Sequence, residues 1–228
     1  MKRSKAEIVR EYGPFPGIDS VHGLTFDGER VWFASGDKLN AVDPESGAQL
    51  RSFDAIAQAG TAFDGRHLFQ ISDGRIQKLD PQTGDVLATI PAPGGGNDSG
   101  LTWAEGTLWV GQNRERKIYQ IDPETGEILR SITSDRFVTG VTWVDGELWH
   151  GTWEDEASEL RRIDAQTGKV LESVAMPDGV AVSGLESDGG ERFFCGGGTS
   201  GRFRAVRRPK RDTPDARDAN EPVDSTSE

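Results

Sequence analysis

Cysteine is almost absent from this 228-residue chain, which has only Cys195. A single thiol excludes an intrachain disulfide and is compatible with a reducing compartment. Long apolar runs are missing as well: no stretch approaches the roughly 18 residues of a membrane span. The first residues, MKRSKAEIVREYGPF, are basic but lack the apolar segment of a signal peptide. We therefore expect a cytoplasmic protein that does not use a membrane as its partner.

Positive charge is scarce compared with negative charge. The 26 Lys and Arg residues face 38 Asp and Glu residues, which gives a net charge of −12. Such a chain is a poor partner for nucleic acid, whose phosphates attract cationic surfaces. A helical period of 3.6 is also missing, whereas glycine is abundant, with 29 residues. This composition favours an all-β protein with many tight turns.

Internal repeats indicate the architecture. Five related segments begin 37 to 44 residues apart: HGLTFDGERVWFASG at 22, AGTAFDGRHLFQISDG at 59, SGLTWAEGTLWVGQN at 99, TGVTWVDGELWHGTW at 139 and SGLESDGGERFFCGG at 183. Four of them are followed by a unit such as IYQIDPETGEILRSI. This period is typical of the four-stranded blades of a β-propeller. Asp-Gly and Asp-Pro-x-Thr-Gly segments between the apolar runs predict the turns.

The ends of the chain predict how the ring closes. The fifth unit lacks a fourth strand, and residues 7–13 resemble a fourth strand without a blade before it. Pairing the two completes a five-bladed propeller and removes an open sheet edge. We therefore divide the chain into an N-terminal extension (1–6), a propeller (7–208) and a polar tail (209–228) that we expect to be disordered.

Alignment of the repeats separates scaffold from unusual residues. Aromatic residues recur at two positions of the repeat, where we expect them to pack between blades. A glycine recurs at the start of each first strand, where it lets five strands approach the axis closely. These repeated positions are occupied by Phe26, Phe63, Trp103 and Trp143; by Trp32, Phe69, Trp109, Trp149 and Phe194; and by Gly23, Gly60, Gly100, Gly140 and Gly184.

Three residues depart from the repeat at positions expected on one face, at the mouth of the axial funnel. His22 replaces a small residue, His150 replaces Phe, Gln, Val or Cys, and Trp153 has no aromatic equivalent. Two histidines could exchange protons near neutral pH, so His22 and His150 are the candidate catalytic residues. Each could also have a purely structural role. The candidate substrate-binding residues are Trp153, Gln70, Ser99, Arg116 and Glu154.

Other chemistry at this mouth stays open. The histidines could hold a divalent metal with Asp19, Asp98 or Glu154, but no recognised ligand spacing is present, so the cofactor is unknown. Cys195 could be a nucleophile or a small buried apolar residue.

The repeats HGLTFDGERVWFASG, SGLTWAEGTLWVGQ and TGVTWVDGELWHGTW resemble those of the plant and bacterial glutamine cyclotransferases, over about residues 8–208. They also resemble virginiamycin B lyase and quinoprotein-like propellers. The first resemblance implies a five-bladed propeller that cyclises N-terminal glutamine. His22 and Phe33 stand where that family has a glutamine and an acid, and only Trp153 matches its tryptophan. The family's catalytic acids are unmatched, so efficient glutamine cyclisation is not expected.

Three functions are consistent with these patterns. The first is a cyclotransferase-like or lyase-like enzyme in which the mouth histidines transfer protons on a small molecule held against Trp153. The second is a non-catalytic module that binds a metabolite, a peptide or a protein partner through the funnel face. The third is a scaffold whose acidic rim meets a basic partner. A propeller fold by itself does not choose among them.

Overall fold

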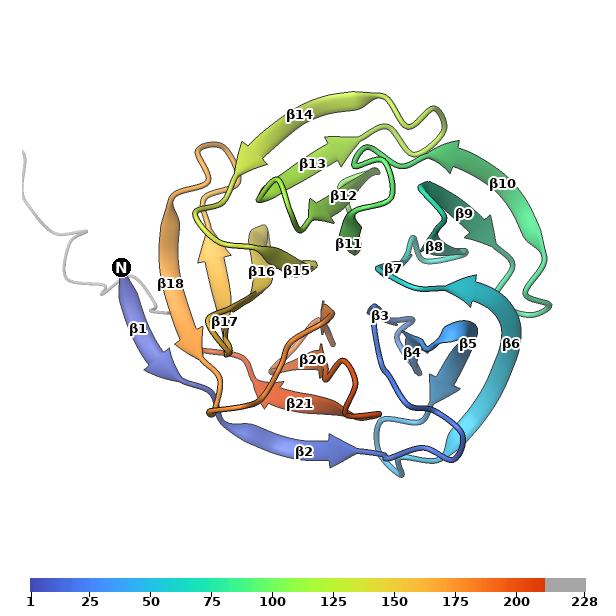
Figure 1. Ribbon diagram of the computed structural model, residues 1–228, viewed down its shortest axis with the longest axis horizontal. Helices are drawn as coiled ribbons and strands as arrows, with labels where there is room; N and C mark the ends of the chain where they lie inside the picture. Colours follow the sequence, from blue (N-terminus) through green and yellow to red (C-terminus); the bar gives the residue numbers. More distant parts are fainter. Residues whose placement is uncertain (212–228) are drawn as a thin grey trace, which may run out of the picture.

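The computed structural model describes residues 1–211, and Figure 1 shows five sheets arranged around a central axis. Each blade contains four antiparallel strands ordered from the axis outward, and blade four has a fifth, parallel strand at its outer edge. This confirms the predicted all-β, five-bladed propeller. None of the described residues forms a helix that could span a membrane.

The first three blades contain consecutive strands of the chain. Blade one consists of β3 (Leu24–Phe26), β4 (Val31–Ala34), β5 (Gly36–Val42) and β6 (Gln49–Ala57). Blade two consists of β7 (Thr61–Phe63), β8 (Leu68–Ser72), β9 (Arg75–Leu79) and β10 (Val86–Pro91). Blade three consists of β11 (Asp98–Ala104), β12 (Thr107–Gln112), β13 (Lys117–Ile121) and β14 (Ile128–Thr133).

The last two blades take strands from the N-terminus. Blade four consists of β15 (Val138–Val144), β16 (Glu147–Glu154), β17 (Ala157–Ile163) and β18 (Val170–Ala175), with β1 (Lys2–Lys5) added outside β18. Blade five consists of β19 (Leu185–Ser187), β20 (Arg192–Gly196), β21 (Phe203–Arg207) and β2 (Ile8–Tyr12).

The antiparallel pairing of β2 with β21 closes the ring as predicted. The Tyr12 ring stacks on Phe203 at 4.3 Å between centroids, and its hydroxyl donates to the Pro44 carbonyl at 2.8 Å. The parallel pairing of β1 with β18 was not predicted. Its sequence, KRSK, has no alternation of apolar and polar residues and all four residues are exposed, so the pattern carries no strand signal. Most of the tail assigned to 209–228 lies outside the described residues.

Side chains fix the tight turns between the third and fourth strands. In the turn after β13, Asp122 Oδ1 accepts bonds from the amides of Glu124 at 3.0 Å and Thr125 at 2.8 Å. Gly126 then takes a φ of +76°, a conformation that favours glycine. The first four repeats all use this Asp-x-x-Thr/Ser-Gly turn, which is why it is visible in the sequence.

Aromatic rings pack between neighbouring blades, as their recurrence predicted. Trp109 of blade three stacks on Trp143 of blade four at 5.6 Å between centroids. Trp149 in turn contacts Phe193 of blade five at 5.0 Å. These large apolar contacts form the walls between the sheets.

The axial glycines permit the closest approach of the inner strands. A Cβ placed on Gly140 would meet the backbone of Leu185 and Gly184 in blade five at well under 3.0 Å. The equivalent glycines of the other four blades would collide with the next blade in the same way. The ring of glycines is therefore a packing requirement.

Replacing Gly140 with alanine is expected to destabilise the fold by about 1–3 kcal/mol, because the added methyl group overpacks backbone that cannot move independently. Gly190→Ala is a matched control, since a Cβ there would meet only the Asp188 side chain, at 3.4 Å. Guanidinium unfolding of both variants measures the difference. Equal stabilities would contradict the packing role of the axial glycine.

Candidate functional site

A polar hollow of about 310 Å³ lies at the axis, on the face where each blade's first strand begins. The residue before each axial glycine lies on its wall: His22, Ala59, Ser99, Thr139 and Ser183. Gln58, Asn97, Asp98, Asn113 and Arg114 complete the lining. We call this hollow the mouth cavity. Concave sites with a few convergent polar groups are where propellers and other folds bind small molecules.

Asp98 is the buried carboxylate of the mouth cavity, with 7% of its surface exposed. Its Oδ1 accepts a bond from the Gly94 amide at 2.8 Å, while its buried Oδ2 has no hydrogen-bond partner. Burial raises the pKa of this carboxyl, against the lowering effect of the Gly94 and Gly96 amides. A buried polar atom without a partner is costly, and a ligand could supply the missing bond.

Gly94 allows the chain to wrap around this carboxylate. A Cβ on Gly94 would lie 2.5 Å from Asp98 Oδ1 and 2.6 Å from Gln112 Cγ. The Gly94–Gly96 segment, which the sequence shows only as a glycine run, therefore gives the carboxylate its backbone donor.

Thr139, another residue of the cavity lining, has a second unsatisfied side-chain atom. It is 7% exposed, and its buried Oγ1 has no hydrogen-bond partner. The corresponding hydroxyls of the two neighbouring blades form hydrogen bonds: Ser99 Oγ donates to the Val138 carbonyl at 2.7 Å, and Ser183 Oγ donates to the Val21 carbonyl at 2.6 Å. Thr139 and Asp98 are therefore the two side chains of the cavity with buried unused hydrogen-bonding atoms.

His22 lies on the wall of the mouth cavity, as its position in the repeat suggested. Its Nε2 is 3.1 Å from Ser20 Oγ. Burial lowers the pKa of the imidazole, so His22 is neutral at pH 7. A neutral imidazole can accept or donate a hydrogen bond, depending on its tautomer.

His150 does not reach the cavity, which corrects its predicted placement. Its side chain is 0% exposed, within β16, and burial lowers its pKa to about 4. Nδ1 lies 3.2 Å from the Gly151 carbonyl, and Nε2 is buried without a hydrogen-bond partner. The two histidines are therefore not brought together, and His150 is closed to a ligand in this conformation.

Gln70 and Cys195 occupy the same position in other blades and are buried too. The Gln70 amide donates to the Ala59 and Ile71 carbonyls at 3.1 and 2.8 Å, which uses its donors within the fold. Burial raises the pKa of the Cys195 thiol to about 12, so this cysteine is not an activated nucleophile.

The remaining candidates, Arg116 of blade three and Trp153 and Glu154 of blade four, are not part of the lining of the mouth cavity. Glu154 accepts a bond from Arg116 at 2.6 Å, and the Arg116 guanidinium also stands over the Phe137 ring, 4.6 Å from its centroid. Trp153 is 36% exposed and borders a separate shallow hollow of about 420 Å³. Ser99 is the predicted substrate-binding residue that does line the mouth cavity.

The chemically distinctive residues of the cavity were only partly visible in the sequence. Asp98 stands two residues before the axial glycine of its repeat. The same position is valine in three other repeats, as Val21, Val138 and Val182, and glutamine in one, as Gln58. That departure is the signal that could have singled out Asp98. Within residues 1–211, no group of three or more His, Cys, Asp or Glu side chains is arranged to hold a metal.

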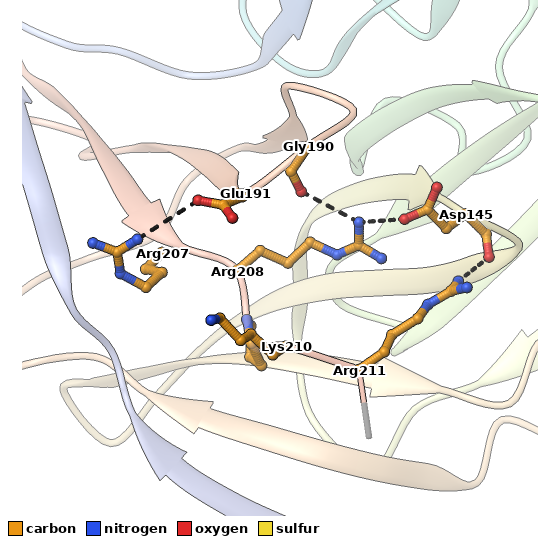
Figure 2. Close-up of a pocket in the computed structure, with 8 residues that line it drawn as sticks. Asp145, Gly190, Glu191, Arg207, Arg208, Lys210 and Arg211 are labelled. Carbon is orange, nitrogen blue, oxygen red and sulfur yellow. Dashed lines mark hydrogen bonds and ion pairs between the residues drawn. The ribbon is translucent and has the colours of Figure 1, made fainter. Parts of the chain in front are cut away.

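Figure 2 shows a smaller hollow, of about 180 Å³, beside the turns that join the first two strands of blades four and five. Its cations are largely paired within the fold: Arg208 donates to Asp145 at 2.6 Å, and Arg207 lies 3.9 Å from Glu191. Arg211 donates to the Asp145 carbonyl. The charged groups of this hollow therefore mostly bind one another, and the mouth cavity is the better candidate for a ligand site.

Solved structures share this architecture. The glutaminyl cyclase of Myxococcus xanthus matches with a TM-score of 0.75 and 18% identity, over 90% of this chain and 97% of the other. A catalytically inactive virginiamycin B lyase from Staphylococcus aureus, solved with Quinupristin, matches with a TM-score of 0.52 and 17% identity, over 86% and 69%. At these identities the likeness establishes the fold. No curated protein matches the sequence.

A family model described as "Domain of unknown function (DUF5074)" matches residues 25–189. The match spans most of the propeller, from the first strand of blade one to the first strand of blade five. The chain therefore belongs to this family of unknown function and is a five-bladed propeller similar in fold to glutaminyl cyclase.

Proposed function

We propose that this protein binds a small polar molecule in the mouth cavity. The observation that carries the proposal is that two residues of the cavity lining each have a buried side-chain atom without a hydrogen-bond partner, Asp98 Oδ2 and Thr139 Oγ1. Leaving such atoms unbonded costs about 1–3 kcal/mol each. A ligand that offers a donor to the carboxylate and a partner to the hydroxyl recovers that cost. The cavity volume of about 310 Å³ suits a metabolite.

Ligand-observed NMR with amines, carboxylates, amino acids and sugars tests this proposal. At least one class should bind wild type, and Asp98→Asn and Thr139→Val should each weaken binding about 10-fold, the effect of one lost hydrogen bond to a desolvated group. Asp85→Asn is the matched control, because this exposed carboxylate lies in the β9–β10 turn at the other end of the strands. Binding that survives both mouth substitutions would contradict the proposal.

A second candidate is proton-transfer catalysis at the same site. It is favoured by two titratable residues of the cavity lining whose pKa values shift in opposite directions, Asp98 upward and His22 downward. In a glutaminyl-cyclase reaction the amino nitrogen attacks the side-chain carboxamide carbon, and the C–N bond to ammonia breaks. One group takes the proton of the attacking amine and the other supplies a proton to the departing ammonia.

Release of ammonia from a short peptide with N-terminal glutamine tests the catalytic candidate. Turnover should fall at least about 100-fold in Asp98→Asn and in His22→Gln, the usual cost of losing a general acid or base. His150→Gln should keep its activity, because His150 lies outside the cavity. An inactive wild type would leave a binding module as the function. A metabolite remains our preferred ligand over a peptide, and the cytoplasmic location remains a prediction.

A further inference from the structure

The side chains of the turn between β12 and β13 differ in how they are engaged. Asn113 donates to the Val138 carbonyl at 3.3 Å. Glu115 accepts bonds from Lys117 and Tyr119, both at 3.0 Å. Arg116 pairs with Glu154.

Arg114, the second residue of this turn, makes no hydrogen bond, ion pair or ring contact with any described residue, and it lines the mouth cavity. The cavity therefore has a free guanidinium on its wall.

The free guanidinium and the buried carboxylate come from the same blade. Asp98 pairs with Gln112 in the ladder between β11 and β12, two residues before Arg114. The two charges nevertheless form no ion pair within 4.0 Å. Asp98, whose buried Oδ2 has no partner, and Arg114 thus line one cavity with side chains of opposite charge.

From this arrangement we infer that the ligand is a small zwitterion, with an ammonium group that binds Asp98 and a carboxylate that binds Arg114. The inference rests on the proposed mouth-cavity function and specifies its ligand class. An ammonium supplies the donor that Asp98 Oδ2 lacks, and a carboxylate matches the forked donors of a guanidinium. Thr139 and Asn97, which belong to the same lining, add polar side chains for the rest of the ligand.

The test compares zwitterions with their single-charge analogues. The probes are the twenty L-amino acids, followed by β-alanine, 4-aminobutyrate and 5-aminovalerate, whose charges lie at increasing separations. Each zwitterion that binds is compared with its N-acetyl and amide derivatives, and butylamine and butyrate serve as simple references. Ligand-observed NMR finds the binders and calorimetry gives their Kd values. At least one zwitterion should bind at least about 10-fold more tightly than either single-charge analogue, since charge-assisted hydrogen bonds are the strong ones.

Two substitutions separate the charged ends. Asp98→Asn should remove the advantage of the zwitterion over its N-acetyl derivative but keep its advantage over the amide. Arg114→Gln should do the reverse. Arg66→Gln is the matched control, because Arg66 is exposed in the β7–β8 turn, away from the mouth, and its side chain has no described partner. Thermal unfolding verifies that every variant folds.

The outcomes distinguish this inference from the proposed function. If an amine or a carboxylate alone binds as tightly as the zwitterion and depends on Asp98 or Arg114, the zwitterion is wrong and the mouth cavity stands. If only uncharged polar probes bind, the same conclusion holds. If no probe binds in a manner that depends on the mouth residues, both proposals fail.

Discussion

Replacing Glu186 with glutamine is expected to change the free energy of unfolding, relative to wild type, by about 3 kcal/mol more in the stabilising direction at pH 8 than at pH 5. Glu186 lies on β19, the inner strand of blade five, and is buried, with 8% of its surface exposed. Burial raises the pKa of its carboxyl from the ordinary value of 4.5 to about 7. Between these values the folded protein holds a proton that the unfolded chain releases. The free energy of unfolding therefore decreases as the pH rises from 4.5 to 7, and the loss remains above pH 7.

The hydrogen bonds of Glu186 explain why glutamine fits in its place. Thr142 of blade four donates to one carboxyl oxygen at 2.5 Å, and the Ser187 amide donates to the same oxygen at 2.8 Å. Thr25 of blade one is 3.1 Å from the other oxygen. Glutamine keeps an acceptor for the first two donors and presents its NH₂ group to the Thr25 hydroxyl, which can accept. It thus resembles the protonated acid but does not titrate.

Urea unfolding between pH 4.5 and 8 measures this effect as the difference between variant and wild type, so other titrating groups cancel. Glu186→Ala should show the same pH dependence but lower stability than Glu186→Gln at every pH, because it leaves the two threonines without their partner. A difference between Glu186→Gln and wild type that does not change with pH would show that the buried carboxyl has an ordinary pKa.

The repeats made the fold predictable, because the first four blades reuse the same turn residues and because aromatic residues that pack between neighbouring blades recur along the chain. Ring closure was predictable because the fifth repeat ends near residue 208 without a fourth strand, while a fourth-strand segment begins near residue 7 without a blade before it. The strand Lys2–Lys5 could not be predicted in this way. It has no apolar face, and its backbone is paired with the edge of β18, a tertiary contact that leaves no period in the sequence.

The candidate site was predictable only to the level of the repeat. Position in the repeat placed His22 and Ser99 at the mouth correctly, because a residue before the axial glycine must lie near the axis. It misplaced His150, since the end of a second strand can face either the cavity or the neighbouring blade. Phe33 and Cys195, which are apolar at that same position, are buried in the structure and correctly indicate an interior. A comparison of His150 with these equivalent residues would have predicted a buried position for it as well.

The repeat also explains the unpartnered nitrogen of His150 and leads to a second large expected effect. In blade two, Gln70 lies opposite Thr61, whose hydroxyl donates to Gln70 Oε1 at 2.6 Å. In blade four the corresponding pair is His150 opposite Val141. Valine offers no hydrogen bond, which leaves His150 Nε2 without a partner. His150→Gln with Val141→Thr transfers the complete blade-two pair into blade four.

As the pH falls from 6.5 to 4, the free energy of unfolding of the double variant is expected to increase relative to that of wild type by up to about 3 kcal/mol. Burial lowers the pKa of His150 from its ordinary value of 6.5 to about 4. Between those values the unfolded chain binds a proton that the folded protein refuses, so wild type loses stability as the pH falls. Glutamine removes this loss. Val141→Thr should add about 1 kcal/mol in the presence of His150→Gln, the usual worth of one neutral hydrogen bond.

A double-mutant cycle of unfolding free energies at pH 4.5 and 7.5 measures both terms. His150→Gln and Glu186→Gln should change the pH dependence in opposite directions, because one buried group resists protonation and the other resists deprotonation. This opposition separates each titration from general effects of acid on the fold. A pH-independent difference for His150→Gln would mean that water reaches the imidazole, and His150 would then return as a candidate ligand-binding residue. The same variant should leave binding in the mouth cavity unchanged if His150 stays buried between the blades.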